Sequence, residues 1–238
     1  MLSRIVIAAM VYSLLTICID ANAWECKEAK TKVEKLICAD TDHQTKWLDD
    51  LLNSEYIRAI DRSDKPDQLR SDQRTWLRTI RNKCSTVMCL RRAYLKRIPL
   101  ISRSSDDIEG VYFTNGSCIT EPWEDEEGNF IGKDCNPPWI NHLIIEKTSN
   151  NKYHIISEVA QFATGNFMCD ADAFMNRNAN ILSLSKWADE EGPDAKCPFT
   201  ITIKPDGFVI STNGEQCGLC GRNGNFDGEV FPRKSNAK

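Results

Sequence analysis

The sequence predicts an α+β protein in which a disulfide-bonded bundle of four short helices precedes a small antiparallel β barrel or sandwich. Apolar residues recur at helical spacing between positions 27 and 98, whereas short period-two segments separated by turn residues follow from position 110. The charge also divides the chain: residues 24–103 carry 18 Lys and Arg against 12 Asp and Glu, a net of +6, and residues 104–238 carry 11 against 21, a net of −10. We therefore expect two domains, residues 24–103 and 104–238, which either attract each other or leave the acidic half to recognise a partner.

The first 23 residues have the features of a secretory signal peptide. Arg4 supplies an early positive charge, residues 5–19 are almost entirely apolar, and Ala21-Asn22-Ala23 is a small-x-small cleavage site. A membrane anchor is less favoured because a bilayer span takes about 20 apolar residues. We expect residues 1–23 to be removed and the mature chain to be periplasmic, with secretion as the alternative and no membrane span.

The cysteines indicate disulfide bonds rather than thiol chemistry. The chain has 11 cysteines, and ten remain after Cys18 leaves with the signal peptide. An even number in an exported chain is typical of a disulfide framework.

Four helices are expected in the basic half. The first, over residues 27–38, is predicted by an apolar stripe of Ala29, Val33, Leu36 and Ile37. The second begins after a cap at Asp40 or Thr41 and runs to about residue 60. Pro66 suits the first turn of the third helix, and the fourth follows Cys84 and Cys89 until Pro99 ends it.

The pairing of the cysteines in this half depends on the first helix. If that helix is continuous, Cys26 and Cys38 lie about 18 Å apart, beyond the separation of about 7 Å that a disulfide allows. Antiparallel second and third helices would bring Cys84 back beside Cys38, so we prefer Cys38–Cys84 and Cys26–Cys89. The rival bond, Cys84–Cys89, would leave Cys26 and Cys38 without partners in this half.

The basic half also carries an ordered series of motifs. It begins with C-x2-A-x-T-x2-E-x2-I-C-x-D from Cys26 to Asp40 and continues with Leu48-Asp49, Tyr56, Gln73, Trp76-Leu77, Arg81, Cys84 and C-L-x3-Y-x2-R from Cys89 to Arg97. In this order and spacing, residues 26–100 resemble the LprI-type lysozyme-inhibitor N-terminal domain. The family takes its name from inhibition of lysozyme, and the resemblance implies that role. Its recurring residues are mostly cysteines and core aromatics, which explain folding rather than a binding site; Glu34 is expected to form a structural ion pair with Arg78 or Arg81.

The acidic half is predicted to be β-rich. Alternating apolar residues before the turn Pro205-Asp206-Gly207 predict a hairpin over residues 198–212, and a second hairpin is expected over residues 140–159. Further short strands at 110–114, 181–186 and 228–231 bring the total to about seven, which favours a small barrel or sandwich. The closing stretch from Cys217 is weakly similar to the end of small exported β-domains of unassigned function.

Six cysteines lie in the acidic half. Cys118 and Cys135 bracket a long loop and are natural partners. The other four are expected to pair among themselves in one of three ways that the sequence leaves open: Cys169, Cys197, Cys217 and Cys220.

No catalytic chemistry stands out in the sequence. Cys217-Gly-Leu-Cys220 has the spacing of a redox pair but precedes a turn rather than a helix, so structural cysteines are the favoured interpretation. His43, His142 and His154 are too scattered for a zinc site. No nucleophile motif or defined pair of catalytic acids is visible, so we expect no enzyme, cofactor or metal.

The loop between Cys118 and Cys135 is the candidate partner-binding site. Its segment 121–127 holds one indole among five acids: Glu121, Trp123, Glu124, Asp125, Glu126 and Glu127. A solvated charge run is the simpler explanation, but a disulfide-closed acidic loop would also steer toward the cationic cleft of a lysozyme, with Trp123 as its anchor. The predicted function is therefore inhibition of a lysozyme-like muramidase. The alternatives are a cell-envelope interaction or stress module and neutralisation of another basic protein effector; no nucleic-acid partner is expected, and the oligomeric state stays open.

Overall fold

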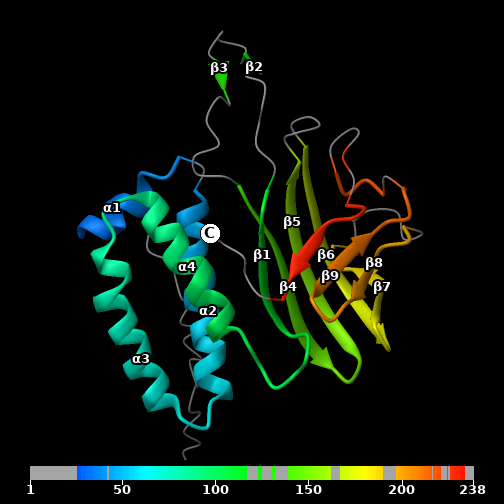
Figure 1. Cartoon of the computed structure of the whole chain (residues 1–238), viewed down its shortest axis with the longest axis horizontal. Coiled ribbons are helices and arrows are strands. Elements are labelled where there is room, and N and C mark those ends of the chain that lie inside the picture. The colour runs from blue at the N-terminus through cyan, green and yellow to red at the C-terminus, as the bar shows by residue number, and fades with distance from the viewer. Residues whose placement is uncertain are drawn as a thin grey trace, which may run out of the picture.

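The computed structural model describes residues 26–41, 43–116, 123–124, 130–131, 139–161, 167–189, 197–215, 217–220, 224 and 226–233. The predicted signal peptide, residues 1–23, lies outside this set. The chain forms four α-helices on one side of an eight-stranded antiparallel sheet that curls into a nearly closed barrel (Figure 1). The predicted α+β class is confirmed, and the barrel is the form that the β-rich part takes.

The helices follow the apolar periodicity of the sequence closely. α2 and α3 form a hairpin, and α4 packs along α2 with Leu90, Tyr94 and Ile98 fully buried (Figure 1). Pro66 occupies the first turn of α3, where its missing N–H is tolerated. Pro99 lies inside α4 rather than ending it, so the helix continues for two residues beyond the predicted boundary. The bounds are α1 Lys32–Cys38, α2 Gln44–Arg62, α3 Pro66–Thr79 and α4 Val87–Ile101, with short 3-10 turns η1 Cys26–Glu28 and η2 Arg81–Lys83.

The expected first helix is broken, and this overturns the preferred disulfide pairing. Thr31 adopts an extended backbone and caps α1: its hydroxyl accepts a hydrogen bond from the Glu34 N–H, and the Glu34 carboxylate accepts one from the Thr31 N–H. The chain therefore turns back before α1 and brings Cys26 to Cys38, with a Cα separation of 5.6 Å. Glu34 serves as half of this cap rather than in the expected ion pair with Arg78 or Arg81.

The second cysteine pair of the helical part is also local. Cys84 and Cys89 form the rival bond, with Cα atoms 5.4 Å apart across the turn into α4. The predicted pairs Cys38–Cys84 and Cys26–Cys89 are wrong, because both depended on a continuous first helix.

Eight strands follow in an order that keeps neighbours in sequence adjacent in space. The order is β1-β4-β5-β6-β7-β8-β9-β10, and β1 also lies close to β10, which nearly closes the barrel. β6, the longest strand, was not predicted; the other predicted strands are present. The bounds are β1 Gly110–Asn115, β4 Ile140–Ser149, β5 Lys152–Gln161, β6 Phe167–Asn178, β7 Ile181–Trp187, β8 Thr200–Ile203, β9 Gly207–Ser211 and β10 Val230–Pro232, and a separate ribbon pairs β2 Trp123–Glu124 with β3 Phe130–Ile131.

The barrel interior is filled by side chains that alternate along the strands. Ile155, Leu182, Phe199, Phe208 and Phe231 are fully buried there, so the barrel is a packed core. Two disulfides border this core and resolve the three alternatives: Cys169 bonds Cys220, and Cys197 bonds Cys217. The four cysteines thus pair among themselves as predicted.

The helices pack against the outer face of the barrel. Val111 and Phe113 of β1 and Ile140 and Ile144 of β4 belong to the same buried cluster as Leu48 and the other apolar side chains of α1, α2 and α4. The two structural parts therefore share one hydrophobic cluster. The division into domains 24–103 and 104–238 stays a prediction.

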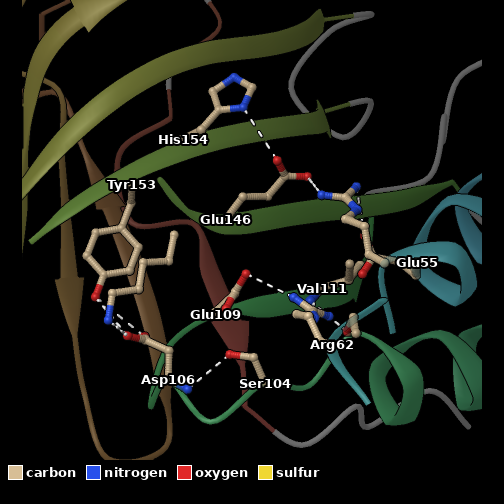
Figure 2. A network of polar contacts seen from close by, with 12 residues as sticks. Glu55, Arg62, Ser104, Asp106, Glu109, Val111, Glu146, Tyr153 and His154 are labelled. Carbon is tan, nitrogen blue, oxygen red and sulfur yellow. Dashed lines mark hydrogen bonds and ion pairs between the residues drawn. The ribbon is translucent and has the colours of Figure 1, made fainter. Parts of the chain in front are cut away.

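Ion pairs reinforce this interface between the basic helices and the acidic strands. Arg58 of α2 contacts Glu55 in its own helix and Glu146 of β4, and Arg62 Nη1 lies 3.1 Å from a Glu109 carboxylate oxygen (Figure 2). Below these pairs in Figure 2, the Asp106 carboxylate forms an ion pair with Lys147 and accepts a hydrogen bond from the Tyr153 hydroxyl. The opposite charges of the two halves thus act at least partly on each other.

Candidate functional site

The predicted acidic loop leaves the barrel between β1 and β4. A hydrogen bond from the Gly116 N–H to the Trp139 carbonyl, 2.8 Å, closes its base. Within it, the backbones of β2 and β3 form a short antiparallel ribbon that projects beyond the barrel (Figure 1). The side chains of the proposed contact residues Glu121, Trp123, Glu124, Asp125, Glu126 and Glu127, and the predicted Cys118–Cys135 bond, lie outside the described residues.

A pocket of about 190 Å³ lies at the base of this loop, between the start of α2 and the outer face of the barrel. We call it the aromatic pocket because two tryptophans and two histidines contribute to its wall. Its lining residues are His43, Gln44, Trp47, Trp139, Ile140, His142 and Glu158. None of these was predicted as a site residue.

A buried arginine fixes the helical side of the aromatic pocket. Arg91 of α4 is 2% exposed and forms a bidentate ion pair with Asp40: Nη2 donates to Oδ1 at 2.6 Å and Nε donates to Oδ2 at 3.1 Å. Asp40 also accepts a hydrogen bond from the Thr45 N–H. Arg91 Nη1 donates to Gln44 Oε1 at 3.1 Å, and the same oxygen accepts the Ile140 N–H at 3.2 Å. This chain of contacts ties α4, the start of α2 and the start of β4 together at the pocket.

The start of α2 also carries a left-handed residue. His43 precedes the helix with φ 56°, a conformation that costs a non-glycine residue free energy and must be held by its surroundings. Its placement brings Trp47, one turn into α2, over the barrel.

His142 forms the floor of the aromatic pocket. Its ring lies 4.4 Å from the Trp47 ring, centroid to centroid, and its side chain is 5% exposed. Among the described residues, we find no hydrogen bond to its ring nitrogens. Burial lowers the pKa of His142 to about 4, so the imidazole is neutral at pH 7.

His142 should make stability depend on pH in a defined window. Its folded pKa is about 4 and its usual value 6.5, so between these the unfolded chain binds a proton that the folded chain excludes. Stability is therefore lost as pH falls from about 6.5 to 4, by at most about 3 kcal/mol. His142→Phe keeps a ring against Trp47 but cannot titrate, so the difference in unfolding free energy between wild type and variant should change by that amount across the window, measured by urea denaturation. Parallel curves would contradict the assignment.

Two carboxylates lie next to His142 on the outer face of the barrel. His142 pairs in register with Glu158 of β5, and Glu158 pairs with Asp170 of β6. Burial and then the charge of Asp170 raise the pKa of half-buried Glu158, while a hydrogen bond from Trp139 opposes the rise. No ion pair is found for either carboxylate within the described part of the chain, and Glu158 is the one of the two that lines the pocket.

The motif residues of the helical part have structural roles. The Tyr94 hydroxyl donates to Asp49 at 2.6 Å, and Arg81 contacts both. Arg97 donates to Gln73 at 3.0 Å and lies over the Trp76 ring. These residues hold α2, α3 and α4 together.

Comparison with known families decides what this part of the chain is. The family model described as Lysozyme inhibitor LprI matches residues 25–103. These residues are an LprI domain. The match covers all four helices and ends before β1, so the LprI domain supplies the α2 side of the aromatic pocket and the barrel supplies the other. No curated protein and no solved structure matches the chain.

The LprI domain and the disulfides indicate an extracytoplasmic protein. Cys217 and Cys220 are bonded to Cys197 and Cys169 rather than to each other, so they do not form the redox pair that their spacing resembles. In the described ranges, no helix is long and apolar enough to cross a membrane, and no group of three or more potential ligands is placed to hold a metal.

The pocket residues were missed for an identifiable reason. His142 lies in the hairpin predicted over residues 140–159, and Trp47 lies in the second predicted helix, so each position is already accounted for by its predicted element. The sequence carries no signal of a strand covered on both faces, because Asn141 and His142 interrupt the apolar run; the structure shows that residues 140–145 are nevertheless buried without a break, as in such a strand. That buried run marks β4 as the strand between the barrel core and the helices.

Proposed function

We propose that this protein binds and inhibits a lysozyme-like muramidase in the periplasm. The LprI domain at residues 25–103 is the observation that carries the proposal. The protein acts by binding, through the end of the molecule from which the acidic loop projects.

The charge distribution supports this orientation. Residues 121–127 of the acidic loop contribute five carboxylates, and Glu158 and Asp170 add two more at its base. A cationic muramidase would be attracted to this end over a distance of roughly one Debye length, about 8 Å at physiological salt. Contact would then be made by the loop, with Trp123 as the proposed anchor, and by the rim of the aromatic pocket.

The test is the residual activity of several lysozyme classes titrated with the oxidised chain from Trp24 to Lys238. We use the whole chain because the helices and barrel share a buried cluster, so separated halves would expose it. Stoichiometric inhibition that weakens with salt is expected. If no class is inhibited, the function is refuted, and an envelope protein partner becomes the leading alternative.

Neutralising the loop should weaken inhibition. Changing Glu124, Glu126 and Glu127 to Gln and Asp125 to Asn removes four charges, and we expect about tenfold weaker inhibition at low salt with a flatter salt dependence. The matched control changes four exposed aspartates to Asn near the turn between α2 and α3, at the opposite end of the molecule (Figure 1): Asp61, Asp64, Asp67 and Asp72. Equal effects of the two sets would show that net charge, and not the loop, sets the affinity.

A further inference from the structure

One side of the aromatic pocket continues into a row of polar side chains across three strands. His142 of β4, Glu158 of β5 and Asp170 of β6 are in register on adjacent strands, and Trp47 of α2 covers the first of them. Trp139 completes the wall beside Glu158. Two indoles, a neutral imidazole and the Glu158 carboxylate thus line one hollow, and Asp170 lies beside Glu158 on the next strand, outside this lining.

The two carboxylates are arranged unfavourably unless a cation joins them. Like charges directly opposite each other on neighbouring strands repel, and burial of Glu158 strengthens the repulsion. Elsewhere on this outer face, acids have partners: Glu146 contacts Arg58, and Asp172 contacts His154. Glu158 has the hydrogen bond from Trp139, but the described part of the chain provides no ion-pair partner for Glu158 or Asp170.

The remaining groups suit the same kind of ligand. Indole faces attract cations through their negative quadrupole. His142 lines the pocket as a residue that is 5% exposed, and among the described residues no hydrogen bond is found to its ring nitrogens. Because the pKa of this ring is lowered to about 4, the ring is uncharged at pH 7 and can accept a hydrogen bond from a cation instead of repelling it.

We propose that the aromatic pocket is a receptor for one cationic side chain, an arginine guanidinium, held between Trp47 and Trp139 and paired with Glu158. This extends the proposed function, on which it rests for the identity of the partner: the arginine belongs to the surface of the bound muramidase. The site itself is built by this chain alone, so it can be tested without any muramidase.

The first experiment uses Nα-acetyl-arginine amide as the probe. Binding to the oxidised whole chain is followed by the indole N–H signals of Trp47 and Trp139 in NMR spectra, assigned with Trp47→Phe and Trp139→Phe. Nα-acetyl-citrulline amide, which has nearly the same shape without the charge, is the control probe. We expect the arginine probe to shift both signals and the citrulline probe to shift neither.

Variants then test the carboxylates. Glu158→Gln should weaken binding of the arginine probe about tenfold, and Asp170→Asn should weaken it less, because Asp170 lies farther from the indoles along the row. Asp67→Asn, which changes an aspartate that is 95% exposed on α3, should have no effect. The proposal that the pocket binds an arginine side chain would be contradicted by equal shifts with both probes, by no shift with either probe, or by unchanged binding in Glu158→Gln.

The same variants in the inhibition assay separate this inference from the proposed function. Arginine binding without inhibition of any lysozyme refutes the proposed function and leaves the receptor in place. Inhibition that Glu158→Gln does not weaken overturns insertion of a muramidase arginine and leaves the inhibitor in place. Loss of both activities in Glu158→Gln, with Asp67→Asn unchanged, supports both proposals together.

Discussion

Replacing Asp40 with Asn should lower the free energy of unfolding by about 3–5 kcal/mol. The side chains of Asp40 and Arg91 are 4% and 2% exposed, so the substitution leaves a buried guanidinium without its counter-ion. Burial of Asp40 opposes its ionisation, but hydrogen bonds from Arg91 and Thr45 outweigh burial and hold the pKa of Asp40 below its usual value. The pair therefore stabilises the fold at pH above the unfolded value of 3.8, and this stabilisation is lost as pH falls through the lower folded value.

Urea denaturation of wild type, Asp40→Asn and Asp67→Asn measures this effect. Asp67 also contacts an arginine, but the pair lies on the surface of α3, and its removal should cause no measurable loss. The double variant Asp40→Leu with Arg91→Met should recover most of the stability, because apolar side chains can replace a buried ion pair. If Asp40→Asn is as stable as Asp67→Asn, the charge of Asp40 is not needed to stabilise the buried Arg91 guanidinium.

Removing the Cys169–Cys220 bond should destabilise the barrel by about 4 kcal/mol. The bond joins residues 51 apart in sequence, so its absence frees a long segment in the unfolded chain. Cys84–Cys89 spans only five residues and should contribute about 2 kcal/mol by the same reasoning. Paired substitutions by alanine, compared by urea denaturation under oxidising conditions, measure the difference. A larger loss from the short bond would contradict the dependence on loop length.

The helical part was predictable because its signals are local. Apolar periodicity, Pro66 and the motif order placed all four helices to within a few residues. The error at the first helix comes from one residue: Thr31 lies inside the helix predicted over residues 27–38, yet Thr31 with Glu34 three positions later is the signature of a helix start. Because the chain turns at Thr31, Cys26 pairs with Cys38 and Cys84 with Cys89, so both predicted disulfides of the helical part are wrong.

The barrel was predictable in class and less so in detail. β6 was missed because its inward positions include the small residues Ala171 and Ala173, while the outward face mixes Asp170 and Asp172 with apolar Phe174, so the alternation carries little apolar contrast. The pairing of the last four cysteines required the closed barrel, which brings Cys169 of β6 beside Cys220 as an isolated bridge. Neither feature follows from spacing along the chain.

The aromatic pocket was the least predictable feature. It joins α2 to β4 and β5, segments about 100 residues apart, and depends on Gln44 bridging Arg91 and Ile140. Sequence composition indicated an acidic partner-binding loop but not the hollow at its base. The register of His142, Glu158 and Asp170 became visible only with the strand pairing.

Calorimetric titration of the oxidised whole chain into a basic lysozyme, at low and moderate salt, tests the central claim most directly. We predict one-to-one binding that weakens as salt rises and weakens about tenfold in Glu158→Gln but not in Asp67→Asn. Absence of binding at either salt concentration, across lysozymes of several classes, would contradict the claim that this LprI domain and its barrel form a muramidase inhibitor.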